Sequence, residues 1–197
     1  MVNKLSQLSC TKFLAEKIQQ LKIAVIGDVM LDRYFYGDVK RISPEAPVPV
    51  NKVTRITSVL GGAANVAANL AHLECKVYVG GVTGDDENRR LLEGMMAEAG
   101  IDYSGLIKSD KRSTITKMRI LGAKQQMLRL DFEEVGDLFE DETERLSEWL
   151  LNLIDGGLDG IAVSDYAKGV CSHNFLQWVI KTAGEHKVPV LVDPKGE

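Results

Sequence analysis

Acidic residues follow three apolar runs of the chain, each where a buried strand is expected to end. Asp28 follows "AVIG", Asp165 follows "IAVS" and Asp193 follows "VLV". Ligands of open parallel sheets bind beyond the carboxyl ends of the strands. A carboxylate at that edge can accept hydrogen bonds from sugar hydroxyls, although each aspartate could equally cap the turn that follows it. Three aspartates, each at the expected end of a strand, favour a site that binds a polyol.

A second candidate lies in "LGGAANVAANLAHL", residues 60–73. This segment is expected to form a helix that opens on Gly61 and Gly62, with Asn65 one turn inside. The first N–H groups of a helix are free, and glycine lets a ligand approach the backbone closely. The backbone at Gly61 and Gly62 and the side-chain amide of Asn65 could therefore bind a polyol. Tight packing of the helix on a strand is the alternative explanation.

Basic residues recur in a later β-prone region. Lys117 and Arg119 stand two residues apart, so on a strand both point to the same face. Arg129 lies nearby, and Lys168 follows Asp165 in "SDYAKG". A charged strand face is the ordinary explanation for such residues. The alternative is a phosphate site, because arginine suits phosphate geometry.

Apolar strands and amphipathic helices must position these residues. Strands are expected at 22–28, 76–84, 157–165 and 188–196, and helices at 11–20, 60–73, 86–99, 141–155 and 172–187. Their alternation predicts a mostly parallel sheet with flanking helices. Two β-rich inserts interrupt it, at about 33–59, which is punctuated by prolines, and at about 113–133, with a hairpin turn near Gly122. The expected organisation is an N-terminal helix within 1–21 and one α/β domain over 22–197.

Composition narrows the class of protein. The net charge of −4 gives no reason to expect nucleic acid as a partner. Three cysteines show neither metal-ligand spacing nor a disulfide framework, and the sequence has no signal peptide or long apolar run, so we expect a cytoplasmic protein without a membrane segment. "VTGDDE" lacks the lysine of a phosphate loop, and "VIGDVMLD" lacks the glycine spacing of a dinucleotide site.

Several stretches together resemble the ribokinase-like (PfkB) carbohydrate kinases. They are "VIGDVMLDRYFYGDVKRISPEAPVPV", "GGAANVAANLAHL", "TITKMRI", "QQMLRLDFEE", "VSDYAKGV" and "VPVLVDPKG". Within that family, "RISPEAPVPV" and "SDYAKG" are most similar to kinases that phosphorylate D-glycero-β-D-manno-heptose 7-phosphate at the anomeric oxygen. The resemblance implies a cytoplasmic enzyme of lipopolysaccharide core synthesis that uses ATP and Mg²⁺. It also implies that the two inserts form a lid, which pairs two subunits into a homodimer.

The resemblance implies roles for particular residues. Those expected to hold sugar hydroxyls are Asp28, Gly61, Gly62 and Asn65. Further sugar or phosphate contacts are expected from Asp32, Arg119, Asp165 and Lys168. Asp193 and Lys195 are expected near the nucleotide and magnesium, supporting the reaction without taking part in it.

One family motif is missing from this sequence. The "GAGD" helix start, which supplies the aspartate base and the anion hole of these kinases, occurs nowhere in the 197 residues. We therefore expect no catalytic residue in this chain, an incomplete ribokinase-like domain, and no activity from these residues alone. A non-catalytic sugar-binding or interaction module is the alternative function, and another PfkB sugar kinase is a third.

Overall fold

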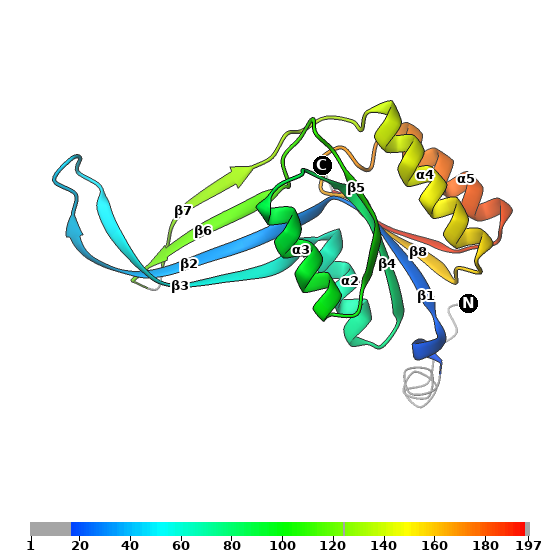
Figure 1. Ribbon diagram of the computed structural model, residues 1–197, viewed down its shortest axis with the longest axis horizontal. Helices are drawn as coiled ribbons and strands as arrows, with labels where there is room; N and C mark the ends of the chain where they lie inside the picture. The colour runs from blue at the N-terminus through cyan, green and yellow to red at the C-terminus, as the bar shows by residue number, and fades with distance from the viewer. Residues whose placement is uncertain (1–16, 124, 196–197) are drawn as a thin grey trace, which may run out of the picture.

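The computed structural model describes residues 17–123 and 125–195. Their strands form two sheets, one of five strands and one of four. The first forms the body of the molecule together with the helices, and the second projects from it as a long ribbon (Figure 1). The alternation of strands and helices predicted a mostly parallel sheet with β-rich inserts, and this architecture is confirmed.

The five-stranded sheet is parallel throughout. In spatial order its strands are β5 (Asp102–Lys108), β4 (Lys76–Thr83), β1 (Lys22–Gly27), β8 (Gly160–Ser164) and β9 (Val190–Asp193). The carboxyl ends of β1, β8 and β9 therefore lie next to one another at the same end of the sheet. Strand β5 was not expected from the sequence, because "DYSGLIK" mixes polar and apolar residues without a clear period.

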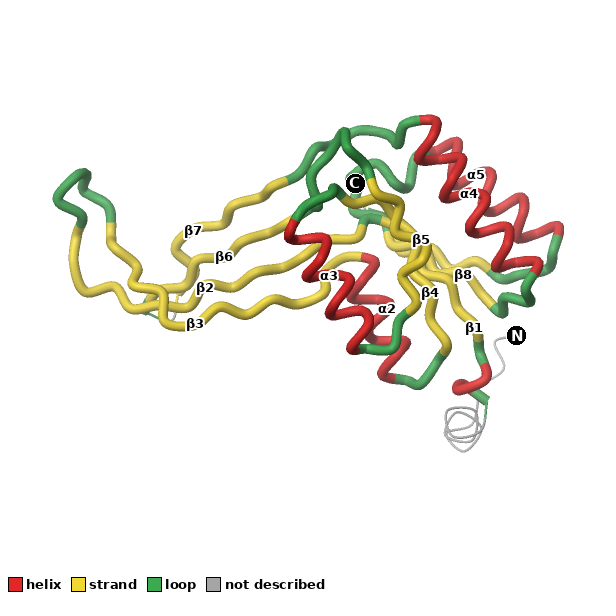
Figure 2. The backbone as a smooth tube through the Cα atoms, viewed as in Figure 1, coloured by secondary structure: helices red, strands yellow, loops and turns green. Residues whose placement is uncertain are grey.

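The four-stranded sheet contains the two β-rich inserts. In spatial order its strands are β3 (Pro49–Gly62), β2 (Val29–Ile42), β6 (Thr116–Gly122) and β7 (Gln125–Phe132). Strand β2 pairs antiparallel with β3 and parallel with β6, while β6 and β7 form the expected hairpin. Strand β2 begins immediately after Asp28, so the ribbon starts at the end of the five-stranded sheet where β1 ends (Figure 2).

Helices cover both faces of the five-stranded sheet (Figure 1). The helices are α2 (Ala63–His72), α3 (Glu87–Glu98), α4 (Glu140–Asp155) and α5 (His173–Glu185), preceded by the 3₁₀ turn η1 (Ile18–Gln20). Alternate residues of β1 face opposite cores, because side chains of a strand alternate. Val25 packs with the buried residues of α2 and α3, whereas Ala24 and Ile26 pack with those of α4 and α5.

Local sequence signals explain where the helices begin and end. Asp86 caps α3 by accepting a hydrogen bond from the Arg89 amide at 2.9 Å, and Ser172 caps α5. Gly100, with φ of 70°, follows the end of α3 in the left-handed conformation that glycine commonly adopts there. The helix predicted at 11–20 lies mostly outside the described residues, and its last three described residues form the 3₁₀ turn.

Candidate functional site

The two sheets meet at the carboxyl end of β1, and most candidate residues lie around this junction. Asp28 stands between β1 and β2, and Gly62 ends β3 where α2 begins. Strand β8 ends beside β1, so the loop that follows it, residues 165–172, lies over the same edge.

Asp28 does not present its carboxylate to a ligand, which corrects the expectation that it binds sugar hydroxyls. The residue is fully buried. One oxygen accepts hydrogen bonds from the amides of Tyr166 at 2.9 Å and Lys168 at 3.0 Å, and the other from that of Val170 at 3.2 Å. Asp28 thus fixes the β8–α5 loop, and the free acceptor expected from the sequence is occupied by backbone.

Gly61 and Gly62 both belong to β3, and Gly62 is also the N-cap residue of α2, so the helix begins after the two glycines and not at Leu60 as expected. The first residue of α2 is Ala63, whose amide donates to the Asp28 carbonyl at 3.0 Å. Gly62 has a φ of 55°, and a Cβ there would lie 2.1 Å from that same carbonyl oxygen. Glycine is therefore required at position 62, because of the positive φ and the close packing against this carbonyl.

Gly61 is required for another reason, which involves the aspartate on the neighbouring strand. A Cβ at Gly61 would lie 2.5 Å from Asp32 Oδ2. The Asp32 carboxylate therefore lies over the bare Gly61 backbone, and its side chain keeps 17% of its surface exposed. Arg119 of β6 donates a hydrogen bond to the other Asp32 oxygen, and its guanidinium lies 5.2 Å from the ring centre of Tyr34. The structure thus brings Asp32, Gly61 and Arg119 together.

Further charges continue this cluster along the four-stranded sheet. Lys117 Nζ lies 3.5 Å from carboxylate oxygens of both Asp131 and Glu133. Lys168 Nζ, on the β8–α5 loop, donates to Glu133 at 2.6 Å. Arg129 holds Asp131 through two hydrogen bonds of 2.6 and 2.7 Å. The ribbon and the loop are thus joined by alternating cations and carboxylates.

These contacts set the charge state of the cluster. The hydrogen bond from Lys168 and the nearby charge of Lys117 hold the pKa of Glu133 below its ordinary value, although partial burial opposes the shift. The hydrogen bonds from Arg129 likewise lower the pKa of Asp131. Both carboxylates are therefore ionised at neutral pH, so the cations around them are largely neutralised by the protein itself.

Asp131 and Glu133 were not predicted as site residues. Together with Arg129 they occupy every second position of "RLDFE", the spacing that places side chains on one face of a strand. That alternation was the available signal. It was missed because the basic residues alone were considered.

Among the described residues, neither Asn65 nor Asp165 joins this cluster through a hydrogen bond or ion pair. Asn65 is the third residue of α2, in its first turn, and its side chain is exposed. Asp165 accepts a hydrogen bond from the amide two residues on, that of Ala167, at 2.7 Å. This is the turn-capping role that the sequence left open for Asp165.

Asp193 and Lys195 are exposed at the end of β9. The Asp193 carbonyl accepts from the Asp165 amide at 3.0 Å, which connects this end to the β8–α5 loop. Within residues 17–123 and 125–195, no group of three or more His, Cys, Asp or Glu side chains is arranged to hold a metal ion. In the same ranges, no helix is long and apolar enough to cross a membrane.

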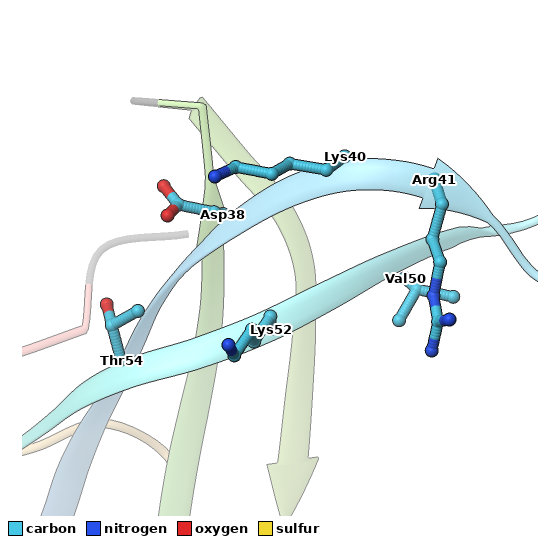
Figure 3. A pocket seen from close by; sticks show the side chains of 6 residues that line it. All are labelled: Asp38, Lys40, Arg41, Val50, Lys52 and Thr54. Carbon is cyan, nitrogen blue, oxygen red and sulfur yellow. The ribbon is translucent and has the colours of Figure 1, made fainter.

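A separate hollow lies near the far end of the ribbon (Figure 3). Its volume is about 530 Å³, and its lining residues from β2 and β3 are Asp38, Lys40, Arg41, Val50, Lys52 and Thr54. Asp38 is six residues beyond Asp32 on the same strand, a separation of about 20 Å. This basic hollow is therefore remote from the strand ends. A smaller one of about 270 Å³ lies beside the β8–α5 loop, with Asp165, Gly169 and His173 among its lining residues.

Comparison with known proteins identifies the family. The model of a protein family described as "pfkB family carbohydrate kinase" matches residues 20–197 of the chain. The chain belongs to this family.

Two curated relatives are similar to this chain over most of its length. The chain is 48% identical over 174 residues to bifunctional protein HldE of Methylobacillus flagellatus, covering 88% of this chain and 36% of that protein. It is 44% identical over 185 residues to D-beta-D-heptose 7-phosphate kinase of Bordetella bronchiseptica, covering 93% of this chain and 56% of that protein. The chain thus spans between about a third and just over half of the length of these relatives.

Solved structures share the fold. A carbohydrate kinase from Agrobacterium tumefaciens aligns with a TM-score of 0.64 at 18% identity, covering 87% of this chain and 53% of that one. Phosphofructokinase-2 from Escherichia coli, in complex with fructose-6-phosphate, aligns with a TM-score of 0.65 at 19% identity, covering 90% and 55%. The ribokinase-like α/β fold predicted from the sequence is confirmed.

Proposed function

We propose that the protein uses ATP to phosphorylate O1 of D-glycero-β-D-manno-heptose 7-phosphate, giving the 1,7-bisphosphate, and that residues 17–195 supply its sugar-binding part. The observation that carries this proposal is the cluster at the sheet junction. There an accessible carboxylate, Asp32, lies over the bare backbone of Gly61 and beside the guanidinium of Arg119. The relative from Bordetella bronchiseptica, which is named for heptose 7-phosphate, supports the choice of sugar.

The chemistry of each group fits a phosphorylated polyol. The Asp32 carboxylate can accept hydrogen bonds from two neighbouring hydroxyls, and Gly61, which has no Cβ, leaves the space that this carboxylate occupies. Arg119 and the nearby lysines provide donors for a phosphate. Asn65, exposed in the first turn of α2, can donate to and accept from a further hydroxyl.

Groups for phosphoryl transfer are expected elsewhere in the longer protein. Mg²⁺ has no full ligand set among the described residues, so no step is assigned to it here. We retain Asp193 and Lys195 as proposed contacts near ATP, since both are exposed at the carboxyl end of β9. The general base and anion hole are proposed to come from residues outside this sequence, because the matched region makes up only 36% and 56% of the two relatives.

We further propose a homodimer in the cytoplasm that feeds lipopolysaccharide core synthesis. The support for the dimer is an exposed apolar surface on the four-stranded sheet, which includes Ile56, Leu128, Leu130 and Phe132. Large exposed apolar patches mark interaction surfaces.

The test is an assay of ADP formation by the full-length protein with ATP and Mg²⁺. We expect kcat/KM to be highest with the heptose 7-phosphate, compared with fructose 6-phosphate and ribose. Preference for either of those sugars would assign another sugar kinase of the family. Sugar binding without any ADP formation would assign the non-catalytic module.

A matched pair of variants locates the site. Asp32→Asn is expected to lower kcat/KM by about tenfold or more, because a charged acceptor for hydroxyls is lost. Asp38→Asn removes a carboxylate from the same strand at the distant hollow and is expected to leave kcat/KM unchanged. The opposite pattern would move the sugar to that hollow and contradict the proposed site.

A further inference from the structure

Two arginines face each other across the β6–β7 hairpin. Arg119 and Arg129 are direct partners in the antiparallel register, so their side chains lie on the same face of the sheet. Like charges in directly opposed positions are destabilising. Such a pair is best explained by something that the two cations serve together.

In this structure each arginine is neutralised by a different carboxylate. Arg119 holds Asp32 of β2, and Arg129 holds Asp131, two residues along its own strand. Asp131 is also the main cause of the raised pKa of Arg129, to which the charges of Glu133 and Asp32 add. The charge of Asp32, which pairs with Arg119, therefore also acts on Arg129.

Both arginines remain open to solvent. The side chains of Arg119 and Arg129 keep 21% and 44% of their surface exposed. A guanidinium binds a phosphate through two parallel hydrogen bonds, and two guanidinium groups can bind one dianion from both sides. Neither Lys117 nor Lys168 offers this geometry, since an ammonium group acts as a point charge.

We propose that Arg119 and Arg129 together bind the phosphate group that the sugar already carries, and that this phosphate displaces Asp32 from Arg119. Asp32 is then free to accept the sugar hydroxyls. This inference rests on the proposed function and adds Arg129 as a residue that determines specificity. Without a ligand, Asp32 is the anion that pairs with Arg119. When the sugar phosphate is bound, Asp32 accepts hydrogen bonds from the sugar hydroxyls.

A coupling between two parts of the substrate follows. An unphosphorylated sugar competes with Arg119 for the Asp32 carboxylate and offers no replacement anion to the guanidinium. A sugar phosphate supplies that anion in the same event. Phosphate and polyol should therefore assist each other's binding, and by thermodynamic linkage each must raise the affinity for the other by the same factor.

The test is calorimetric titration of the full-length protein with heptose 7-phosphate and with the same heptose without phosphate. In the wild-type protein, inorganic phosphate is expected to tighten binding of the unphosphorylated heptose. Arg129→Gln is expected to weaken heptose 7-phosphate binding by about tenfold, to leave the affinity for the unphosphorylated heptose unchanged, and to abolish the effect of inorganic phosphate.

Arg55→Gln is the matched control. Arg55 is an exposed arginine on β3, at the opposite edge of the same sheet, where its guanidinium lies 3.9 Å from the ring centre of Tyr36. This variant should keep both affinities. Circular dichroism then confirms that both variants are folded.

The outcomes separate this inference from the proposed function. If the wild-type protein binds heptose 7-phosphate but Arg129→Gln binds it equally well, the arginine pair is structural and the inference is overturned. An equal loss for both sugars in Arg129→Gln also overturns it, because the effect then does not depend on phosphate. If the wild-type protein binds neither sugar, the proposed function fails and this inference fails with it.

Discussion

Asp28 and Asp32 lie four residues apart and have different surroundings. Asp28 is enclosed, and its two oxygens accept three backbone N–H groups from the β8–α5 loop. Asp32 is partly exposed and contacts an arginine side chain that can rotate away. Backbone donors in a buried loop are fixed, whereas a partly exposed side chain can change partner. For this reason we assign Asp28 to structure and Asp32 to the ligand.

Replacing Asp28 by asparagine should damage the loop. An amide group turns one acceptor oxygen into an NH₂ group, which would face at least one backbone N–H in a site closed to water. We expect the free energy of unfolding to fall by about 2–4 kcal/mol in urea denaturation. The amides of Tyr166, Lys168 and Val170 should also exchange faster with solvent.

Asp165→Asn provides the control for Asp28→Asn. Asp165 also follows a strand, but only its Oδ1 accepts, from the amide of Ala167, and asparagine keeps that acceptor. We expect a change within about 0.5 kcal/mol. Equal stability losses in the two variants would contradict the separate roles assigned to these strand-end aspartates.

At the scale of elements, the end of β7 is attached to the β8–α5 loop by Glu133. Its carboxylate lies 2.6 Å from Lys168 Nζ and 3.5 Å from Lys117 Nζ. Since Asp28 fixes the backbone of the same loop, one short segment connects the five-stranded sheet, α5 and the ribbon. This contact sets the position of the charged face of the ribbon above the strand ends.

The contact should depend on pH. Glu133 has a pKa below its ordinary value of 4.5 because of Lys168 and then Lys117, so it stabilises the fold above that pH and loses this contribution as pH falls through its lower native pKa. Glu133→Gln should therefore lower the melting temperature at pH 7, and the difference from wild type should shrink below about pH 4.5. Thermal unfolding followed by circular dichroism measures both.

The exposed Glu144→Gln on α4 controls for the loss of one surface carboxylate. We expect it to leave the melting temperature at pH 7 close to that of wild type. A difference between Glu133→Gln and wild type that is the same at pH 7 and pH 3 would contradict the assigned ion pairs.

At the scale of the whole molecule, the ribbon has two unlike faces. One carries Asp32, Lys117, Arg119, Arg129 and Asp131. The other carries an apolar row that crosses all four strands in register, made of Ile56, Phe35, Ile120 and Leu128. A ribbon that projects from the body can cover a ligand with its charged face only if its apolar face is covered by something else. A second copy of the same ribbon fits this need, because an isologous interface requires one self-complementary surface.

We expect Leu128→Lys to weaken dimerisation of the full-length protein by about tenfold or more, because it places a charge in a buried apolar contact. Sedimentation velocity over a range of concentrations measures this. Leu73→Lys, at an exposed leucine beyond the end of α2, should leave the dissociation constant of the dimer unchanged. A wild-type monomer at all concentrations, or equal effects of the two variants, would contradict the proposed interface.

The sequence predicts much of this arrangement, and the failures have physical reasons. The apolar strands of the parallel sheet other than β5, and the β6–β7 hairpin, follow from local patterns. The role of Asp28 does not, because its three donors lie about 140 residues away in the chain. Gly62 was placed in a helix because its close contact with the Asp28 carbonyl is a tertiary feature. Pairing of Arg119 with Asp32 likewise depends on the register between β2 and β6, which the sequence does not specify.

The most direct test of the central claim is the crystal structure of the full-length protein bound to heptose 7-phosphate. The account predicts sugar hydroxyls within hydrogen-bond distance of the Asp32 carboxylate, and Asp28 still bonded to the β8–α5 loop. A sugar bound in the hollow between Lys40 and Lys52, with Asp32 still held by Arg119, would contradict it.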